Sequence, residues 1–95
     1  MEKDLFADQL FEAILTLKTK EECYDFFSDA FTPKEFQAIA QRFVVAKMLD
    51  KKYVYNEIIE ATGASTATIS RVNNALTYGE DGYKTILMKL QEDWL

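Results

Sequence analysis

Residues 55–71 of this 95-residue chain read YNEIIEATGASTATISR, and they carry its strongest structural signal. Gly63 separates two helical patterns and can take the positive φ that a tight turn needs. Ser65 follows as an N-cap, because its hydroxyl can accept a hydrogen bond from a backbone N–H of the next helix. Two helices joined steeply by a short turn form a helix-turn-helix. The stretch therefore predicts helices over 55–62 and 66–78.

The apolar positions of the two helices support the same prediction. Five of them would lock the helices together and onto a core: Ile58, Ile59, Ile69, Val72 and Leu76. A second set then falls on one outward stripe: Ala67, Ser70, Arg71 and Asn74. An ordinary αα-hairpin with a solvated polar face could explain a helix-glycine-helix pattern alone. The joint occurrence of Gly63, Ser65, Ile69 and Arg71 favours a helix-turn-helix.

The outward stripe is small and polar, which suits double-stranded DNA. Small side chains let a helix enter a major groove about 12 Å wide, where Arg71 can pair with guanine and Asn74 with adenine. The N–H groups that begin the second helix suit a phosphate or a base edge. Hydroxyl and ammonium groups can contact the DNA backbone from these positions: Ser65, Thr66, Thr68, Ser70, Lys47, Lys51 and Lys52. Together with Ala67, Arg71 and Asn74 they form the predicted DNA-binding set.

Helical periodicity continues on both sides of this segment. Three glycines and one proline leave little turn material for β-hairpins. Capping patterns open two of the other helices, at Thr19 and at Thr32-Pro33. Gly79 is well placed to follow the C-terminal end of the predicted helix 66–78. The prediction is an all-α domain of six helices, the remaining four lying near residues 4–18, 19–30, 32–52 and 83–95.

The first two helices are apolar over a wider arc than one small core requires. The stripe of the first comprises Leu5, Phe6, Leu10, Ile14 and Leu17, widened by Phe11 and Leu15. A helix that is apolar on more than one side must bury both sides, either across its own domain or on a second copy. We favour a homodimer. The single domain then comprises dimerising helices at 1–31, a core helix at 32–52, the helix-turn-helix at 55–78 and a C-terminal packing helix at 83–95.

The residue types exclude several classes of function. An aromatic content of 14% is too high for a disordered chain. The chain has no histidine and one cysteine, which removes Ser-His-Asp and Cys-His catalysis and the common zinc sites. The Asp and Glu residues are scattered without a convergent pair, which argues against a carboxylate-based hydrolase. We therefore expect a protein that is not an enzyme and binds no metal.

The lone cysteine also bears on the compartment. Cys23 cannot form an intrachain disulfide, which fits a reducing compartment, and its apolar stripe predicts a buried structural thiol. No apolar run approaches the roughly 18 residues of a membrane helix. The N-terminal sequence MEKDLFADQL is acidic and lacks the core of a signal peptide. The expectation is a cytoplasmic protein without a membrane partner.

The net charge of −5 is unevenly distributed. Residues 1–31 hold three Lys against eight Asp or Glu, whereas residues 32–52 hold five Lys or Arg against two. An acidic end joined to a basic middle is common when one face meets DNA, and it also arises by chance in small proteins. The negative net charge, and the presence of only one cation in the predicted helix 66–78, leave an alternative function open. In it, the chain is a protein-interaction or small-ligand-sensing module that keeps the fold without specific DNA binding.

Roughly residues 26–90 resemble the bacterial Trp-repressor superfamily, in particular its branch of small Trp-repressor-like proteins. The matching segments are Thr32-Pro33, Gln41-Arg42, the run from Gly63 to Arg71 (GASTATISR), Asn74-Ala75-Leu76 and the run from Tyr78 to Tyr83 (YGEDGY). The resemblance implies an all-α, six-helix, intertwined homodimer. It also implies a transcriptional regulator, a repressor in type, that binds a palindromic operator.

The resemblance also points to an effector pocket. In tryptophan-responsive members the corepressor lies between two arginines that match Arg42 and Arg71, and Thr32 matches a residue lining the same pocket. Val72 replaces a glycine of those members, and a branched side chain there would intrude on an indole ring. Ala75 replaces a serine that holds the amino group of the ligand. These departures argue against tryptophan, and they leave another small corepressor or no effector as alternatives.

Overall fold

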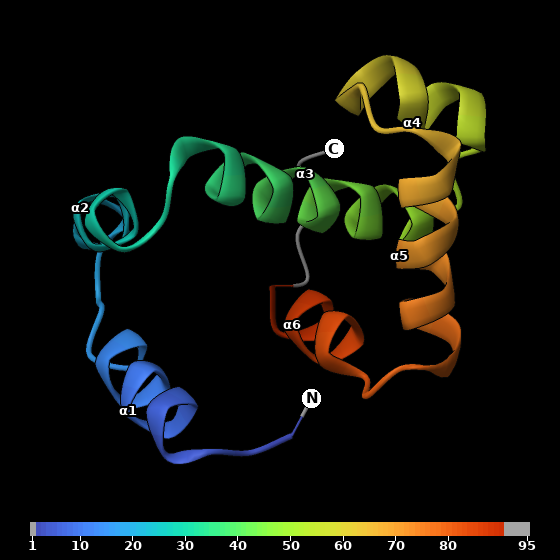
Figure 1. The fold of residues 1–95 in the computed structure, drawn as a ribbon. Helices are drawn as coiled ribbons and strands as arrows, with labels where there is room; N and C mark the ends of the chain where they lie inside the picture. The colour runs from blue at the N-terminus through green and yellow to red at the C-terminus, as the bar shows by residue number, and fades with distance from the viewer. Residues whose placement is uncertain (1, 91–95) are drawn as a thin grey trace. The chain divides into compact units, whose positions relative to one another are not determined.

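Residues 2–90, the part of the chain that the structure describes, form six helices in a computed structural model (Figure 1). The helices are α1 (Leu5–Ile14), α2 (Lys20–Ala30), α3 (Pro33–Asp50), α4 (Tyr55–Thr62), α5 (Thr66–Tyr78) and α6 (Gly82–Leu90). The all-α prediction is confirmed, and α4 and α5 have the predicted bounds. The helices fall into two compact units whose boundary lies inside α3, between Phe36 and Gln37.

In the first unit, α2 begins with the predicted capping box. The Thr19 hydroxyl accepts from the Glu22 N–H at 3.1 Å, and the Glu22 carboxylate accepts from the Thr19 N–H at 3.2 Å. The Phe27 ring packs against the rings of Phe26, Phe31 and Phe36, with centroids 5.2–5.9 Å apart. This aromatic cluster joins α2 to the start of α3.

α1 ends at Ile14, four residues before the predicted end at Lys18. The Thr16 hydroxyl donates to the Ala13 carbonyl at 2.7 Å, so a side chain competes for the carbonyls of the last turn. The backbone N–H of Lys18 donates to the Glu22 carboxylate at 2.7 Å. Lys18, which the sequence placed in α1, is therefore part of the N-terminal cap of α2.

The start of α3 carries a second reciprocal cap. The Thr32 N–H donates to the Glu35 carboxylate at 2.8 Å, and the Glu35 N–H donates to the Thr32 hydroxyl at 3.2 Å. Two hydrogen bonds to the Glu35 carboxyl group lower its pKa below the ordinary value. The larger effect comes from the Thr32 backbone N–H and the smaller one from the Thr32 side chain. Pro33 occupies the first helical position, where its missing N–H removes no helical bond.

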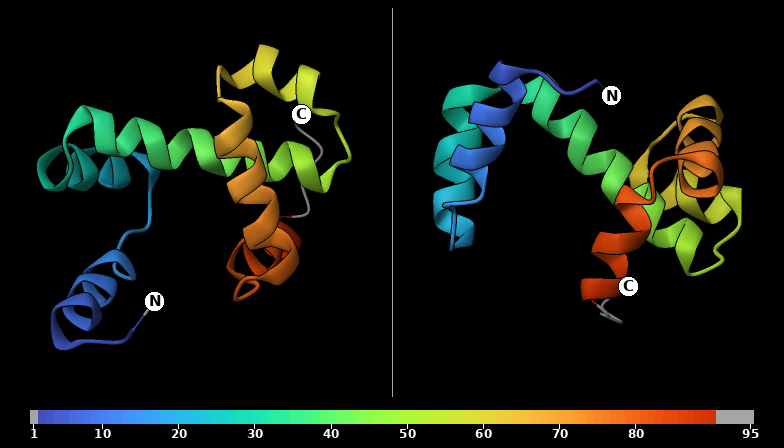
Figure 2. Two further views of the ribbon diagram at one scale, coloured as in Figure 1. Left: turned by 45° about the vertical axis from the view of Figure 1, so that its right-hand side comes forward. Right: turned by 90° about the horizontal axis from the view of Figure 1, so that it is seen from below.

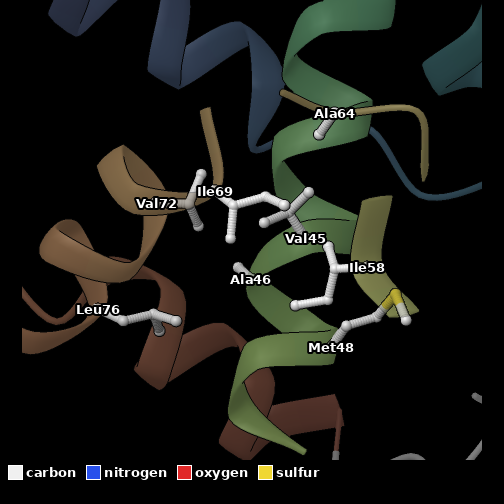
Figure 3. Close-up of a cluster of buried hydrophobic side chains, with 8 residues drawn as sticks. All are labelled: Val45, Ala46, Met48, Ile58, Ala64, Ile69, Val72 and Leu76. Carbon is white, nitrogen blue, oxygen red and sulfur yellow. The ribbon is translucent and has the colours of Figure 1, made fainter. Parts of the chain in front are cut away.

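The second unit contains the hydrophobic core. Eight buried residues form it: Val45, Ala46, Met48, Ile58, Ala64, Ile69, Val72 and Leu76 (Figure 3). They come from the C-terminal half of α3, from α4, from the turn and from α5, and α5 also packs against α6. Both views in Figure 2 show α5 following α4 through a short connection and then leading into α6. The core therefore fixes α5 through one face.

Gly79 directly follows the last residue of α5, as the sequence predicts, but it does not take the left-handed conformation typical of such a glycine. Its φ is −84°. A Cβ at this position would overlap the carbonyl oxygen of Ala75, so close backbone approach explains the glycine. Asp81, with φ 63°, takes the left-handed conformation two residues later.

Large apolar side chains of α1 are exposed in the single chain, Phe6 to 85%, whereas Phe26 and Phe27 of α2 are half-buried. Cys23 is exposed as well, so the prediction of a buried thiol is wrong for the single chain. The two helices of this unit bury none of their residues, since two short helices provide too little surface to cover one another. Among residues 2–90 no helix is long and apolar enough to cross a membrane. Residues 91–95 of the predicted C-terminal packing helix lie outside the described residues.

Candidate nucleic-acid interface

The turn between α4 and α5 is closed by local hydrogen bonds. Gly63 has φ +72°, and its N–H donates to the Ile59 carbonyl at 2.8 Å. The Thr62 hydroxyl donates to the Ile58 carbonyl at 2.7 Å and accepts from the Ala64 N–H at 3.1 Å. Gly63 thus supplies the left-handed residue that the sequence predicted, while Thr62 fixes the chain on both sides of it.

Ser65 caps α5 as predicted. Its Oγ accepts from the Thr68 N–H and donates to the Thr68 hydroxyl, both at 3.1 Å. The two hydroxyls, both predicted as DNA contacts, are therefore bonded to each other in the free chain. Ser65, Thr66 and Ala67 are exposed, and N–H groups in the first turn of a helix have no partner within the helix. This end of α5 can donate hydrogen bonds to a phosphate.

A contact from α3 also reaches this turn. The Gln41 Nε2 donates to the Thr62 carbonyl oxygen at 3.1 Å, and Ala64 is buried in the core at 3% exposure. This bond was not predicted from the sequence. One feature of the sequence could have indicated it: Gln41 lies one helical turn before Val45, on the side of α3 that faces the core.

α5 presents the two faces that its sequence predicts. Ile69, Val72 and Leu76 are buried against α3 and α4 (Figure 3). The outward residues are all exposed: Ala67, Ser70, Arg71 and Asn74. The segment from 61 to 79 contains no Asp or Glu, although the chain has 16 of them. A helix face without carboxylates does not repel a phosphate backbone.

The three predicted lysine contacts separate. Lys52, in the loop after α3, is exposed, and Lys51 is half-buried. Lys47 is 2% exposed, so the prediction that it contacts the DNA backbone is corrected. Residues 45–48 are all buried, and four successive helical residues point in nearly every direction around the axis. The ammonium group of Lys47 is therefore enclosed by the core rather than presented at the surface.

A model of the family described as Trp repressor protein matches residues 6–91. The chain belongs to the Trp repressor family. The uncharacterized protein YerC of Bacillus subtilis is 53% identical over 85 residues, covering 90% of this chain and 82% of that protein. A Trp operon repressor homolog of Chlamydia caviae is 32% identical over 79 residues, covering 82% and 78%.

Solved structures agree with this assignment. The chain superimposes on a candidate Trp repressor from Staphylococcus aureus with a TM-score of 0.92 at 47% identity, covering 96% of this chain and 91% of that one. A TrpR-like protein from Eubacterium eligens gives a TM-score of 0.91 at 53% identity, covering 94% and 92%. The resemblance and the six-helix Trp-repressor fold that the sequence predicted are both confirmed.

The residues predicted to line a Trp-repressor effector pocket lie in different surroundings. Thr32 belongs to the first unit and is bonded to Glu35. Arg42 and Arg71 are exposed residues of the second unit. Val72 is 2% exposed and part of the hydrophobic core. Among residues 2–90 no group of His, Cys, Asp or Glu could hold a metal ion.

Proposed function

We propose that this member of the Trp repressor family is a sequence-specific DNA-binding transcriptional regulator of the cytoplasm, a repressor acting as a homodimer. One observation carries the proposal: α5 buries one face in the core and exposes an opposite face of small polar residues and Arg71, without a carboxylate. The relative described as a Trp operon repressor homolog supports the repressor role.

In this proposal the α5 helices of two subunits enter successive major grooves about 34 Å apart on a palindromic operator. Arg71 and Asn74 would read base edges, directly or through water. The N-terminal turn of α5 and Lys52 would contact phosphates and set the register of the helix. Phosphate contacts position the protein, whereas the two longer side chains specify the sequence.

The exposed apolar side chains of α1 and of Leu15, the residue that follows it, support the homodimer. Leu5, Phe6 and Leu15 are each at least 78% exposed in the single chain. A helix that exposes large apolar side chains on more than one side has to bury them against another surface. A second copy is the occupant that the paired-groove geometry requires.

Tryptophan is not the effector we propose. Val72 fills a core position where the tryptophan-responsive members have glycine, so an indole ring would displace a buried side chain. The proposed regulator works either without an effector or with another small corepressor near Arg42 and Arg71.

The test is selection of bound duplexes from a random DNA library at two salt concentrations, with wild type and Arg71→Ala compared. Each selection is run with and without a pool of amino acids. A palindrome recovered by wild type alone supports the regulator, and dependence on the pool supports a corepressor. No enrichment under any condition contradicts the proposal.

A second candidate is the protein-interaction module, favoured by the net charge of −5 and the single cation of α5. Salt dependence separates the two candidates. Binding that neutralises several phosphates weakens with a log–log slope of about −0.9 per contact. A shallow slope with every DNA tested favours the interaction module.

A further inference from the structure

Gln41 lies on α3, outside the helix-turn-helix, yet it is bonded to the end of α4. Its side-chain amide donates to the carbonyl oxygen of Thr62 at 3.1 Å, a partly buried bond between residues 21 positions apart. Thr62 is the last residue of α4, and carbonyls in the last turn of a helix have no partner within the helix. Gln41 therefore satisfies a backbone group that α4 leaves open.

Thr62 connects this bond to the start of α5. Its hydroxyl donates to the Ile58 carbonyl and accepts from the Ala64 N–H, so one residue closes α4 and shapes the turn. Ala64 is buried, and the next residue, Ser65, is the N-cap of α5. Only Gly63 and Ala64 separate Thr62 from this N-cap, so a shift of the Thr62 carbonyl group would also move the start of α5.

We propose that Gln41 is a positioning residue for DNA recognition, fixing the turn and hence the N-terminal end of α5 before DNA is bound. This inference rests on the proposed function. Apolar packing holds the buried faces of α4 and α5, but such contacts are non-directional. A hydrogen bond from a rigid neighbouring helix adds direction. A turn that is already in place loses less freedom when DNA binds, which strengthens binding without a new contact.

Two substitutions isolate the hydrogen bond. Gln41→Met keeps a similar length and removes the donor. Gln41→Glu keeps the shape, but an ionised carboxylate only accepts hydrogen bonds and would face the Thr62 carbonyl. Gln37 lies one turn earlier on α3 and is exposed, so Gln37→Met is the matched control. If Gln41 only filled space, Gln41→Met would behave as wild type.

The first measurement is amide hydrogen exchange of the protein without DNA. We expect faster exchange at Gly63 and Ala64, by roughly 2- to 12-fold in Gln41→Met, the effect of losing one neutral hydrogen bond. Gln41→Glu should exceed this. Protection at Val45 and Ile58 should stay at the wild-type level, which separates local opening from global unfolding. Wild-type exchange at the turn in both Gln41 variants would overturn the inference.

The second measurement is affinity for the DNA selected by wild type. We expect a loss of similar size in Gln41→Met and a larger one in Gln41→Glu. The salt slope should not change, because the number of phosphate contacts stays the same. An opened turn with unchanged affinity overturns the inference. An opened turn in a protein whose wild type binds no DNA overturns the proposed function, while the fixing of the turn by Gln41 is supported.

Discussion

Ile58 of α4 and Ile69 of α5 are both fully buried, on opposite sides of the turn, and they meet in the core around Val45 of α3 (Figure 3). The orientation of α5 relative to α4 is thus fixed by their common packing on α3 as well as by the turn. This arrangement makes the orientation of α5 sensitive to the volume of a few side chains.

Ile69→Ala should therefore lower the free energy of unfolding by about 2–5 kcal/mol, because it removes buried methylene groups and leaves a cavity. Urea denaturation followed by circular dichroism measures this change. Val54→Ala is the control, since Val54 is 60% exposed and should change stability by about 0.5 kcal/mol at most. Equal effects of the two substitutions would contradict the assigned core.

Gly63→Ala should destabilise the chain by about 1–2 kcal/mol through its backbone alone. The position has φ +72°, and a Cβ there would meet no atom within 4 Å, so strain rather than a clash sets the expected cost. Gly82→Ala is matched to it, because it has the same open surroundings without a positive φ. That control should be neutral or stabilising by up to about 1 kcal/mol. Thermal unfolding of both variants tests the difference.

Arg71→Ala and Lys52→Ala should weaken DNA binding in different ways. Arg71→Ala should cost about 1–3 kcal/mol and relax the preference for one base pair. Lys52→Ala should weaken binding to all sequences alike and reduce the magnitude of the salt slope by about 1. Titrations with the selected site and a scrambled site, each at several salt concentrations, measure both effects. The assignment fails if Lys52→Ala alters sequence preference.

Glu35 predicts a pH dependence of stability. Hydrogen bonds from Thr32 lower its pKa in the folded chain, so the ionised form favours folding. Its contribution is complete above the ordinary value of 4.5 and is lost as the pH falls through the lowered folded pKa. Glu35→Gln keeps a side-chain acceptor but cannot titrate. Thermal unfolding between pH 7 and pH 3 should show a steeper acid loss for wild type than for this variant, and parallel curves would refute the assignment.

The sequence predicted the part of the fold whose signals are local. α4 and α5 have their predicted bounds because Gly63 and Ser65 each act within a few residues. The end of α1 was mispredicted because Thr16 and the reciprocal cap at Glu22 compete with an apolar pattern that continues to Leu17. The spacing of apolar residues predicts where a helix can form, but it does not show which side-chain hydrogen bonds end that helix.

The candidate site shows the same division. The exposed stripe on α5 follows from helical spacing, so the exposure of Arg71 and Asn74 could be predicted from the sequence alone. The burial of Lys47 could not, since it depends on helices that pack on α3 from elsewhere in the chain. The bond from Gln41 to Thr62 was hidden for the same reason, because it joins residues 21 positions apart.

The exposed thiol of Cys23 has a practical consequence. The chain contains a single cysteine, so a maleimide attaches at one defined place on α2 without any engineered substitution. Because α2 is one of the helices proposed to form the homodimer, this thiol should react more slowly once two chains assemble, and its labelling rate then reports the dimer.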